Sequence, residues 1–229
     1  MHKDDTLHRC EELEEAELFD DALDLLNEAV LSAPYDPDYL IMRGRLLSLR
    51  FSDHAAAIAD LLEARRFTPR SCELHQLLSL SYLSLNELDQ AQESADTAIE
   101  IDPSDFMSHI CMGRCMIMQH RFHAAKSSFE AAVTLSPTSE LALKGLGESY
   151  FSMDDFENAI ASFRRASDIC PTTLLFIDLA RSYLKLGNPE QAIYYLEQAN
   201  KLPFEHGLDL VIAGYMKKAL SLRETRSSS

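Results

Sequence analysis

A repeat of 34 residues constrains the fold of this chain more than any other feature of its sequence. Five prolines that follow an apolar run are spaced by 35, 34, 34 and 34 residues: Pro34, Pro69, Pro103, Pro137 and Pro171. An alanine stands five residues before each proline, at Ala29, Ala64, Ala98, Ala132 and Ala166. Another alanine stands seven residues earlier still, at Ala22, Ala57, Ala91, Ala125 and Ala159. Such a period predicts a stack of small repeats, because one repeat cannot bury its apolar side alone.

The first half of each repeat has a signature of its own. One position always holds a small residue: Cys10, Gly44, Ser79, Gly113, Gly147 and Ala180. Small residues opposite alanines let two antiparallel helices approach closely, and turn-forming stretches such as SMDDF and KLGNP separate the two halves. Each repeat is therefore predicted to be a helix A, a turn, a helix B and a loop that ends at the proline. A sixth repeat keeps the pattern with Ala192, Leu196 and Ala199.

These spacings resemble the tetratricopeptide repeat family. The family pattern of W-x2-L-G-x2-Y, then A-x3-F, then A and P, is matched by LALKGLGESYFSMDDFENAIASFRRASDICP, residues 141–171. The resemblance implies an all-α, right-handed α-solenoid of about six helix-turn-helix repeats, which together span residues 1–206. Their expected bounds are 3–36, 37–71, 72–105, 106–139, 140–172 and 173–206.

Both ends of the stack have distinct sequences. The first helix is polar, as an N-terminal cap would be, and residues 207–224 have the apolar spacing of an amphipathic helix. Terminal repeats of a solenoid need such a cap to shield their apolar side, so we expect the last helix to pack on the sixth repeat. Residues 225–229, which include RSSS, are predicted to be a disordered tail.

Charge, cysteine content and motifs exclude several classes of function. A formal charge of −16 argues against nucleic acid as the partner, because phosphate binding needs clustered Lys and Arg. No apolar stretch is long enough to insert into a membrane, and five cysteines without close pairs indicate a reducing compartment. We therefore expect a cytoplasmic protein, with a nuclear location open. No nucleotide-binding or hydrolase motif occurs, so we expect no enzymatic activity and no cofactor.

One crowded stretch, HICMGRCMIMQHRFH from His109 to His123, raises the question of a metal site. His109 and Cys111 are two residues apart on a predicted helix, roughly 200° around its axis, so they cannot share a ligand. Cys111 and Cys115 are four residues apart, but a structural zinc site needs two more convergent ligands. The predicted neighbours offer none, and we expect no metal. We expect His109 to face its helix pair.

The resemblance implies that fixed positions of each helix A line a concave groove. At these positions of the second to sixth repeats the chain places apolar side chains together with five positive and four negative residues, although its total charge is −16. We expect the partner-binding groove to contain Arg45, Leu77, Leu80, Met107, Ile110, Cys111, Arg114, Met118, Lys144 and Arg181. Two plainer interpretations stay open: any single apolar residue could pack helix A against its neighbour, and the Arg residues could serve only in ion pairs between helices.

A groove of this kind predicts a module for protein–protein interaction, an adaptor, scaffold or assembly subunit. Its partner would be a protein or peptide with apolar anchors and some acidic residues. An alternative is a chaperone or co-chaperone that shields an apolar client segment. The family's carboxylate clamp for EEVD tails is absent, since Glu73/Leu77, Met107/Cys111 and Leu141/Gly145 occupy its Lys-x3-Arg positions. Homo-oligomerisation stays open.

The second repeat contains two charges that need each other. Arg43 occupies a position that is apolar in the other repeats, and Asp60 lies in helix B of the same repeat. A charge in a partly buried position is costly without a partner. We therefore expect Arg43 and Asp60 to form an ion pair across the two helices.

Overall fold

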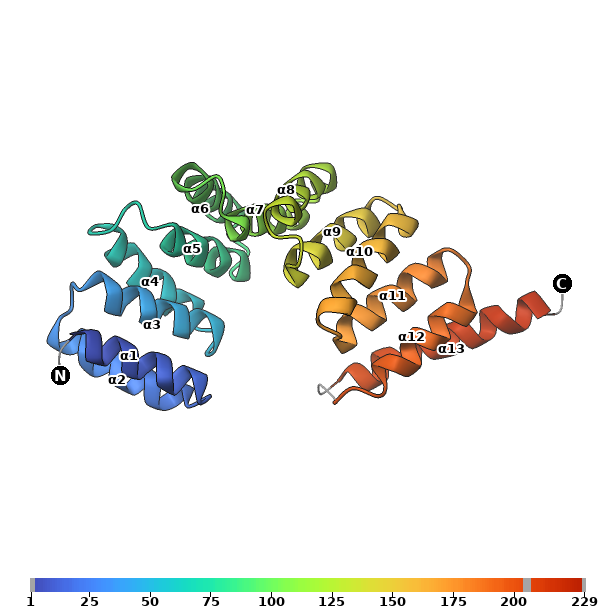
Figure 1. Cartoon of the computed structure of the whole chain (residues 1–229), viewed down its shortest axis with the longest axis horizontal. Helices are drawn as coiled ribbons and strands as arrows, with labels where there is room; N and C mark the ends of the chain where they lie inside the picture. The colour runs from blue at the N-terminus through green and yellow to red at the C-terminus, as the bar shows by residue number, and fades with distance from the viewer. Residues whose placement is uncertain (1–2, 204–206, 228–229) are drawn as a thin grey trace. The chain divides into compact units, whose positions relative to one another are not determined.

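The computed structural model describes residues 3–203 and 207–227, and within these ranges every regular element is a helix. The thirteen helices (Figure 1) are α1 (Lys3–Glu15), α2 (Phe19–Ser32), α3 (Pro37–Leu49), α4 (His54–Arg65), α5 (Cys72–Ser84), α6 (Leu88–Ile101), α7 (Phe106–Met118), α8 (Phe122–Leu135), α9 (Glu140–Ser152), α10 (Phe156–Ile169), α11 (Thr173–Lys185), α12 (Pro189–Ala199) and α13 (Leu208–Ser227). The chain is an all-α solenoid of helical repeats with a C-terminal helix, as the sequence predicts.

The helices form two compact units. The N-terminal unit, Met1–Met118, holds α1 to α7, and the C-terminal unit, Gln119–Ser229, holds α8 to α13. Within each unit, helices that are adjacent in sequence pack side by side, as α3 with α4 and α9 with α10. Odd-numbered helices also pack on one another, α3 on α5, α5 on α7 and α11 on α13. In the N-terminal unit α3, α5 and α7 therefore form one layer of odd-numbered helices.

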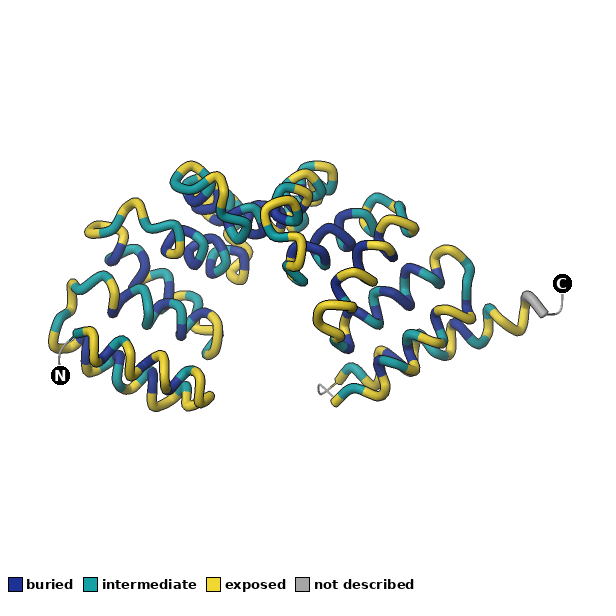
Figure 2. The backbone as a smooth tube through the Cα atoms, viewed as in Figure 1, coloured by how far each residue is buried: buried dark blue, intermediate teal, exposed yellow. Residues whose placement is uncertain are grey.

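The positions that define the repeat form the core. The first alanine of each helix B is wholly buried in all six repeats: Ala22, Ala57, Ala91, Ala125, Ala159 and Ala192. The larger side chains four residues later, such as Phe129 and Phe163, are also at most 1% exposed. Buried residues recur along one side of each helix in Figure 2, because apolar residues at helical spacing share one face. The core that the repeat predicts is confirmed.

In the second and fifth repeats, close packing of the pair depends on a glycine at the small position of helix A. A Cβ on Gly147 would lie 2.6 Å from the Cδ1 of Phe163, and one on Gly44 would lie 2.9 Å from the Cγ of Leu61. Real Cβ atoms do not approach other carbons so closely, so any larger residue would force the two helices apart.

Each turn between the two helices of a pair contains a residue with a left-handed backbone. Their φ values lie between 54° and 67°, at Glu17, Ser52, Asn86, His120, Asp154 and Gly187. Five of these turns have three residues between the helices, whereas the turn 50–53 has four. This is the extra residue that lengthens the second repeat. Several helices then begin at a side chain that caps the first turn, as Asp53 accepts from the amide of Ala56.

The predicted ion pair in the second repeat is confirmed. Arg43 donates from Nε to Oδ2 and from Nη2 to Oδ1 of Asp60, both at 2.7 Å, so α3 and α4 are joined by a bidentate contact. Arg43 Nη1 also donates to the Oδ1 of Asn27 at 3.2 Å, which links α3 to α2. The hydrogen bonds to Asp60 raise the pKa of Arg43 and keep its guanidinium charged.

The C-terminal helix packs on α11 and α12, as expected of a cap. Ile212 and Ala219 are buried in a cluster with Ala180, Leu184 and Leu196 of these two helices. Residues 225–227, which were expected to be disordered, continue α13. The physical reason is that no proline interrupts the segment from Leu208 to Ser227, and residues 228–229 lie outside the described part of the chain. Within 3–203 and 207–227, no helix has the length and apolarity needed to cross a bilayer.

Candidate functional site

The expected groove residues lie on odd-numbered helices, but three of them are buried. Leu77 and Ile110 are 5% and 3% exposed, and Cys111 is not exposed at all. The expectation that these three side chains line an open groove is therefore wrong for this structure. Its physical reason is that α5 and α7 pack directly on each other, so side chains between them serve as core. Leu77, Ile110 and Cys111 stabilise the layer of odd-numbered helices instead.

The contact between α5 and α7 also contains a polar network. Gln76 on α5 donates from Nε2 to Oδ2 of Asp105 at 2.6 Å and to Oγ of Ser108 at 3.0 Å. The backbone amide and hydroxyl of Ser108 both donate to the same Asp105 oxygen at 2.7 Å. Asp105 thus caps the start of α7 and holds it to α5.

Other expected groove residues remain accessible on the same unit. Leu80 and Met107 are half-buried, whereas Arg114 is exposed and Met118 is 39% exposed. Arg114 has no ion pair within the described part of the chain. These four residues keep the mixture of apolar area and positive charge that the sequence indicated for helices α5 and α7.

The buried cysteines have thiols that resist ionisation. Burial raises the pKa of Cys111 to about 12 and that of Cys10 to about 11, and it also raises the pKa of Cys115. Cys170, in contrast, is exposed. Thiol reagents attack the thiolate, so a buried thiol of high pKa reacts slowly.

We expect a thiol reagent to label the folded chain at Cys170 long before Cys111. At about pH 8 a thiol with a pKa near 12 is ionised to about one part in 10,000, and burial slows its reaction further. Tandem mass spectrometry after timed labelling would measure both rates, because fragmentation separates Cys111 from Cys72 within the single tryptic peptide 71–114, and Cys170→Ser is the control that removes the label at Cys170. If Cys111 reacted at the rate of Cys170 in the folded chain, the buried position of Cys111 would be refuted.

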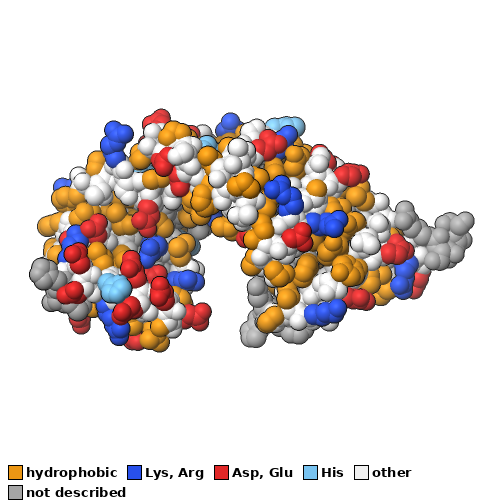
Figure 3. Space-filling view, in the orientation of Figure 1, with side chains coloured by type: hydrophobic (Ala, Val, Ile, Leu, Met, Phe, Trp, Pro, Cys, Tyr) orange, Lys and Arg blue, Asp and Glu red, His pale blue; other side chains and the backbone are white. Residues whose placement is uncertain are grey.

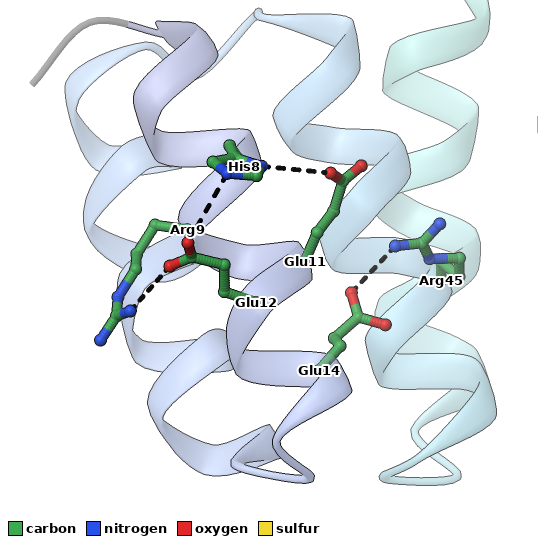
Figure 4. Close-up of polar contacts among 6 residues, drawn as sticks. All are labelled: His8, Arg9, Glu11, Glu12, Glu14 and Arg45. Carbon is green, nitrogen blue, oxygen red and sulfur yellow. Dashed lines mark hydrogen bonds and ion pairs between the residues drawn. The ribbon is translucent and has the colours of Figure 1, made fainter.

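Arg45 on α3 is held by carboxylates from both neighbouring odd-numbered helices. Its Nη2 lies 2.9 Å from Oε1 of Glu14 on α1, and its Nη1 lies 3.7 Å from Oε1 of Glu73 on α5. Figure 4 shows Glu14 pointing from α1 to the Arg45 guanidinium on α3. The Nε of Arg45 is buried and has no hydrogen-bond partner among the described residues. This favours the plainer interpretation of Arg45, a structural ion pair between helices.

Two cations of the C-terminal unit pair instead with carboxylates of their own helices. Arg181 donates from Nη1 to Oδ1 of Asp178 at 2.8 Å and stacks over the ring of Phe151, 4.7 Å from its centroid. Lys144 lies 3.9 Å from Oε1 of Glu148. Burial raises the pKa of Asp178, an effect that Arg181 partly offsets. Lys144 and Arg181 are half-buried, and each is at least partly neutralised by its own helix.

A hollow between α1, α3 and α5 is a part of this surface that the sequence did not predict. We call it the N-terminal hollow; its volume is about 330 Å³, and it is lined by Leu7, Glu11, Asp38, Ile41, Met42, Arg45, Thr68, Ser71 and Glu73. Residues from the first three repeats contribute to it. The signal that could have found it is the acidic first repeat, whose Glu11 lines the hollow with the apolar Ile41 and Met42 of the second repeat.

The crowded stretch from His109 to His123 contains no metal site in this structure. His109 is half-buried, and its Nε2 lies 3.0 Å from the carbonyl oxygen of Pro103; His75 makes the equivalent contact with Pro69 at 2.9 Å. These two histidines therefore tie a helix A to the loop that precedes it. Across residues 3–203 and 207–227, no three His, Cys, Asp or Glu side chains converge to hold a metal ion.

Paired helices in a 34-residue period, with a small residue at each crossing, define an α-helical repeat protein. Family models agree: models described as tetratricopeptide repeat match residues 73–105, 175–206 and 119–172. The chain belongs to the tetratricopeptide repeat family. A search of curated proteins finds no match.

Solved structures share the fold at low sequence identity. A tetratricopeptide repeat protein from Parabacteroides merdae is 16% identical, with a TM-score of 0.75 over 94% of this chain and 83% of that one. PilW, a type IV pilus biogenesis factor, is 17% identical, with a TM-score of 0.80 over 93% of this chain and all of that one. The Cut9–Hcn1 hetero-tetramer of the APC/C gives a TM-score of 0.84 at 16% identity over 94% of this chain and 42% of that one. Likeness at these identities concerns the fold alone.

Proposed function

We propose that this protein is an adaptor or assembly subunit that binds a peptide or helix of a partner protein on its odd-numbered helices. The observation that carries the proposal is the accessible surface of α5 and α7. There Leu80, Met107 and Met118 present apolar area beside the exposed cation Arg114. Accessible apolar side chains on the same helices as an unpaired cation are typical of a contact surface for a partner segment.

The expected chemistry of the partner changes with the ion pairs described above. Arg45, Lys144 and Arg181 were expected to attract acidic residues of a partner, but each already lies within 4.0 Å of a carboxylate of this chain. Of the four cations that were expected in the groove, Arg114 is the one whose charge is not paired with a carboxylate of the described residues and can therefore attract a partner. We therefore propose that acidic recognition, where it occurs, depends on Arg114 and not on a ladder of cations.

The alternative is a chaperone that shields apolar segments of many clients, and affinity capture distinguishes the two. The full chain would be used to isolate binding proteins, which are then purified and recombined with it. One folded protein that binds at a fixed stoichiometry supports the adaptor. Many unfolded clients at variable ratios would support the chaperone and overturn the adaptor.

The contact surface is tested by reversing its exposed charge. We expect Arg114→Glu to weaken binding of the recombined partner at least about tenfold, because a few central residues dominate such contacts. Met118→Glu should weaken it in the same direction. Arg165→Glu makes the same charge change at an exposed position of α10, an even-numbered helix, and should leave affinity within about twofold. Isothermal titration calorimetry provides the affinities, and circular dichroism checks that each variant is folded.

Ile110→Asp is unsuitable for this purpose. Ile110 is 3% exposed, so a carboxylate there would be buried without a partner and would destabilise the unit itself. Equal affinities for Arg114→Glu, Met118→Glu and the unchanged chain would contradict the proposed surface.

A further inference from the structure

The negative charge of this chain is concentrated in its N-terminal unit. Residues 1–118 contain 24 Asp and Glu against nine Lys and Arg, a formal charge of −15, whereas residues 119–229 contain 13 against 12. Residues 1–38 alone contain 13 acidic residues but only two basic ones, Lys3 and Arg9. On the face shown in Figure 3, Asp and Glu side chains gather over the end of the N-terminal unit that holds α1 and α2. A surface of this charge attracts cations and repels anions.

The N-terminal hollow lies at this acidic end and has an apolar lining. Leu7 of α1 and Ile41 and Met42 of α3 are all half-buried, so part of each side chain is accessible. They leave apolar area that a partner side chain could cover.

Acidic residues surround the apolar lining, and the nearby cations do not balance them. Asp38 is bound by Lys3 at 2.6 Å, but Lys3 is shared with Asp36 at 2.8 Å. Arg45 is shared in the same way between Glu14 and Glu73. Two cations therefore serve four carboxylates.

Glu11 is one of three carboxylates that line this hollow, with Asp38 and Glu73, and it has no Lys or Arg partner among the described residues. Its charged contact is His8, whose Nδ1 lies 3.9 Å from Oε2 of Glu11 (Figure 4). His8 is a cation only when protonated, and the Glu11 side chain is 59% exposed. Glu11, together with the exposed Glu73, which shares Arg45 with Glu14, thus leaves net negative charge beside the apolar lining.

We propose that the N-terminal hollow binds a segment of a partner protein in which Lys or Arg stands beside an apolar side chain. The apolar side chain would cover Ile41 and Met42, while the cation would lie between Glu11 and Glu73. This rests on the proposed function, since it assigns the partner's chemistry at the first three odd-numbered helices. It reverses the sequence-based expectation of a partly acidic partner for this end of the surface.

A set of three peptides tests the proposal directly. Each is a capped peptide of about 12 residues with the same apolar side chains and one Trp, and the remaining positions are Lys, Gln or Glu. The chain has no Trp, so Trp fluorescence reports on the peptide alone. We expect the Lys peptide to bind at least about fivefold more tightly than the Gln peptide, and the Glu peptide to bind more weakly still. The advantage of Lys should shrink as salt is added.

Two variants with equal charge change separate the hollow from general attraction to an acidic protein. Glu11→Gln with Glu73→Gln should weaken binding of the Lys peptide about fivefold or more. Asp89→Asn with Glu93→Gln removes the same charge from exposed positions of α6, and Asp89 lies in the first turn of its helix as Glu73 does. This control should change affinity less than about twofold. Circular dichroism verifies the fold of both variants.

Three results would overturn the proposal. Equal binding of the Lys and Gln peptides would remove the role of charge, and equal weakening by both double variants would reduce it to general attraction. A dimer in sedimentation of the chain alone, dissociated by Glu11→Gln with Glu73→Gln, would assign the hollow to a second copy. None of these results affects partner binding that depends on Arg114, so the proposed function is tested separately.

Discussion

A chain that ends at Pro203, and so lacks α13, is expected to melt at least about 10 °C below the full chain and to aggregate on heating. α13 buries Ile212 and Ala219 and half-buries Leu208, Tyr215 and Leu222 against α11 and α12. Each fully buried apolar side chain contributes about 1.5–3 kcal/mol. Their combined loss amounts to about 5 kcal/mol, which corresponds to roughly 10–20 °C in a domain of this size.

The shorter chain would also expose apolar area that the cap now covers, including Leu196 and Ala199. Solenoids with an uncovered last repeat tend to associate, because each repeat depends on its neighbours. A matched control ends the chain at Glu224, after the last residue of α13 that contacts the cluster, and should keep the full melting temperature. Differential scanning calorimetry and light scattering provide the two measurements. Equal melting of the chain that ends at Pro203 would show that α13 is dispensable.

Asp60→Ala is expected to lower the free energy of unfolding by about 2–4 kcal/mol. The substitution leaves the Arg43 guanidinium between α3 and α4 without its carboxylate, and the remaining contact is the single hydrogen bond to Asn27. Removing one partner of a buried pair costs about 3–5 kcal/mol, and the 21% exposure of the Arg43 side chain reduces this figure. Urea denaturation followed by circular dichroism measures the change.

Two controls define the origin of that loss. Replacing both partners, Arg43→Met with Asp60→Leu, should recover most of the stability, because an apolar pair leaves no unpaired charge. Glu63 lies on α4, as Asp60 does, and forms an exposed ion pair with Arg66. Glu63→Ala removes one partner of this pair and should lower the free energy of unfolding by less than about 1 kcal/mol. A loss for Asp60→Ala no greater than that for Glu63→Ala would show that the Arg43 contact carries no special weight.

The helices and their core were predictable because the repeat fixes which residues of each pair face each other. Ala57, Gly44 and Leu61 are buried together for the reason that their spacing implies. The Arg43–Asp60 pair followed from the same register, since a charge in an apolar position of one repeat needs a partner in that repeat. Contacts within a repeat can therefore be derived from one sequence.

The surface was harder to predict because it depends on contacts between repeats. The register places Cys111 on the inner side of α7, but only the packing of α7 on α5 shows that this side is closed at Cys111 and open at Met118. The pairing of Arg45 with Glu14, 31 residues earlier, depends on the same stacking. The Asp178–Arg181 pair is different: its spacing of three residues on one helix could have been recognised from the sequence.

The left-handed turns determine where this array can change in length. The turn 50–53 holds one residue more than the others, yet Ser52 keeps the same backbone conformation, and Gly44 still lies against Leu61 as Gly147 does against Phe163. The added residue is therefore absorbed at the surface, where a longer loop costs little conformational entropy. Duplication or insertion in such a gene could lengthen these turns without altering how the helices stack, whereas one residue inserted inside a helix would rotate its core positions by about 100°.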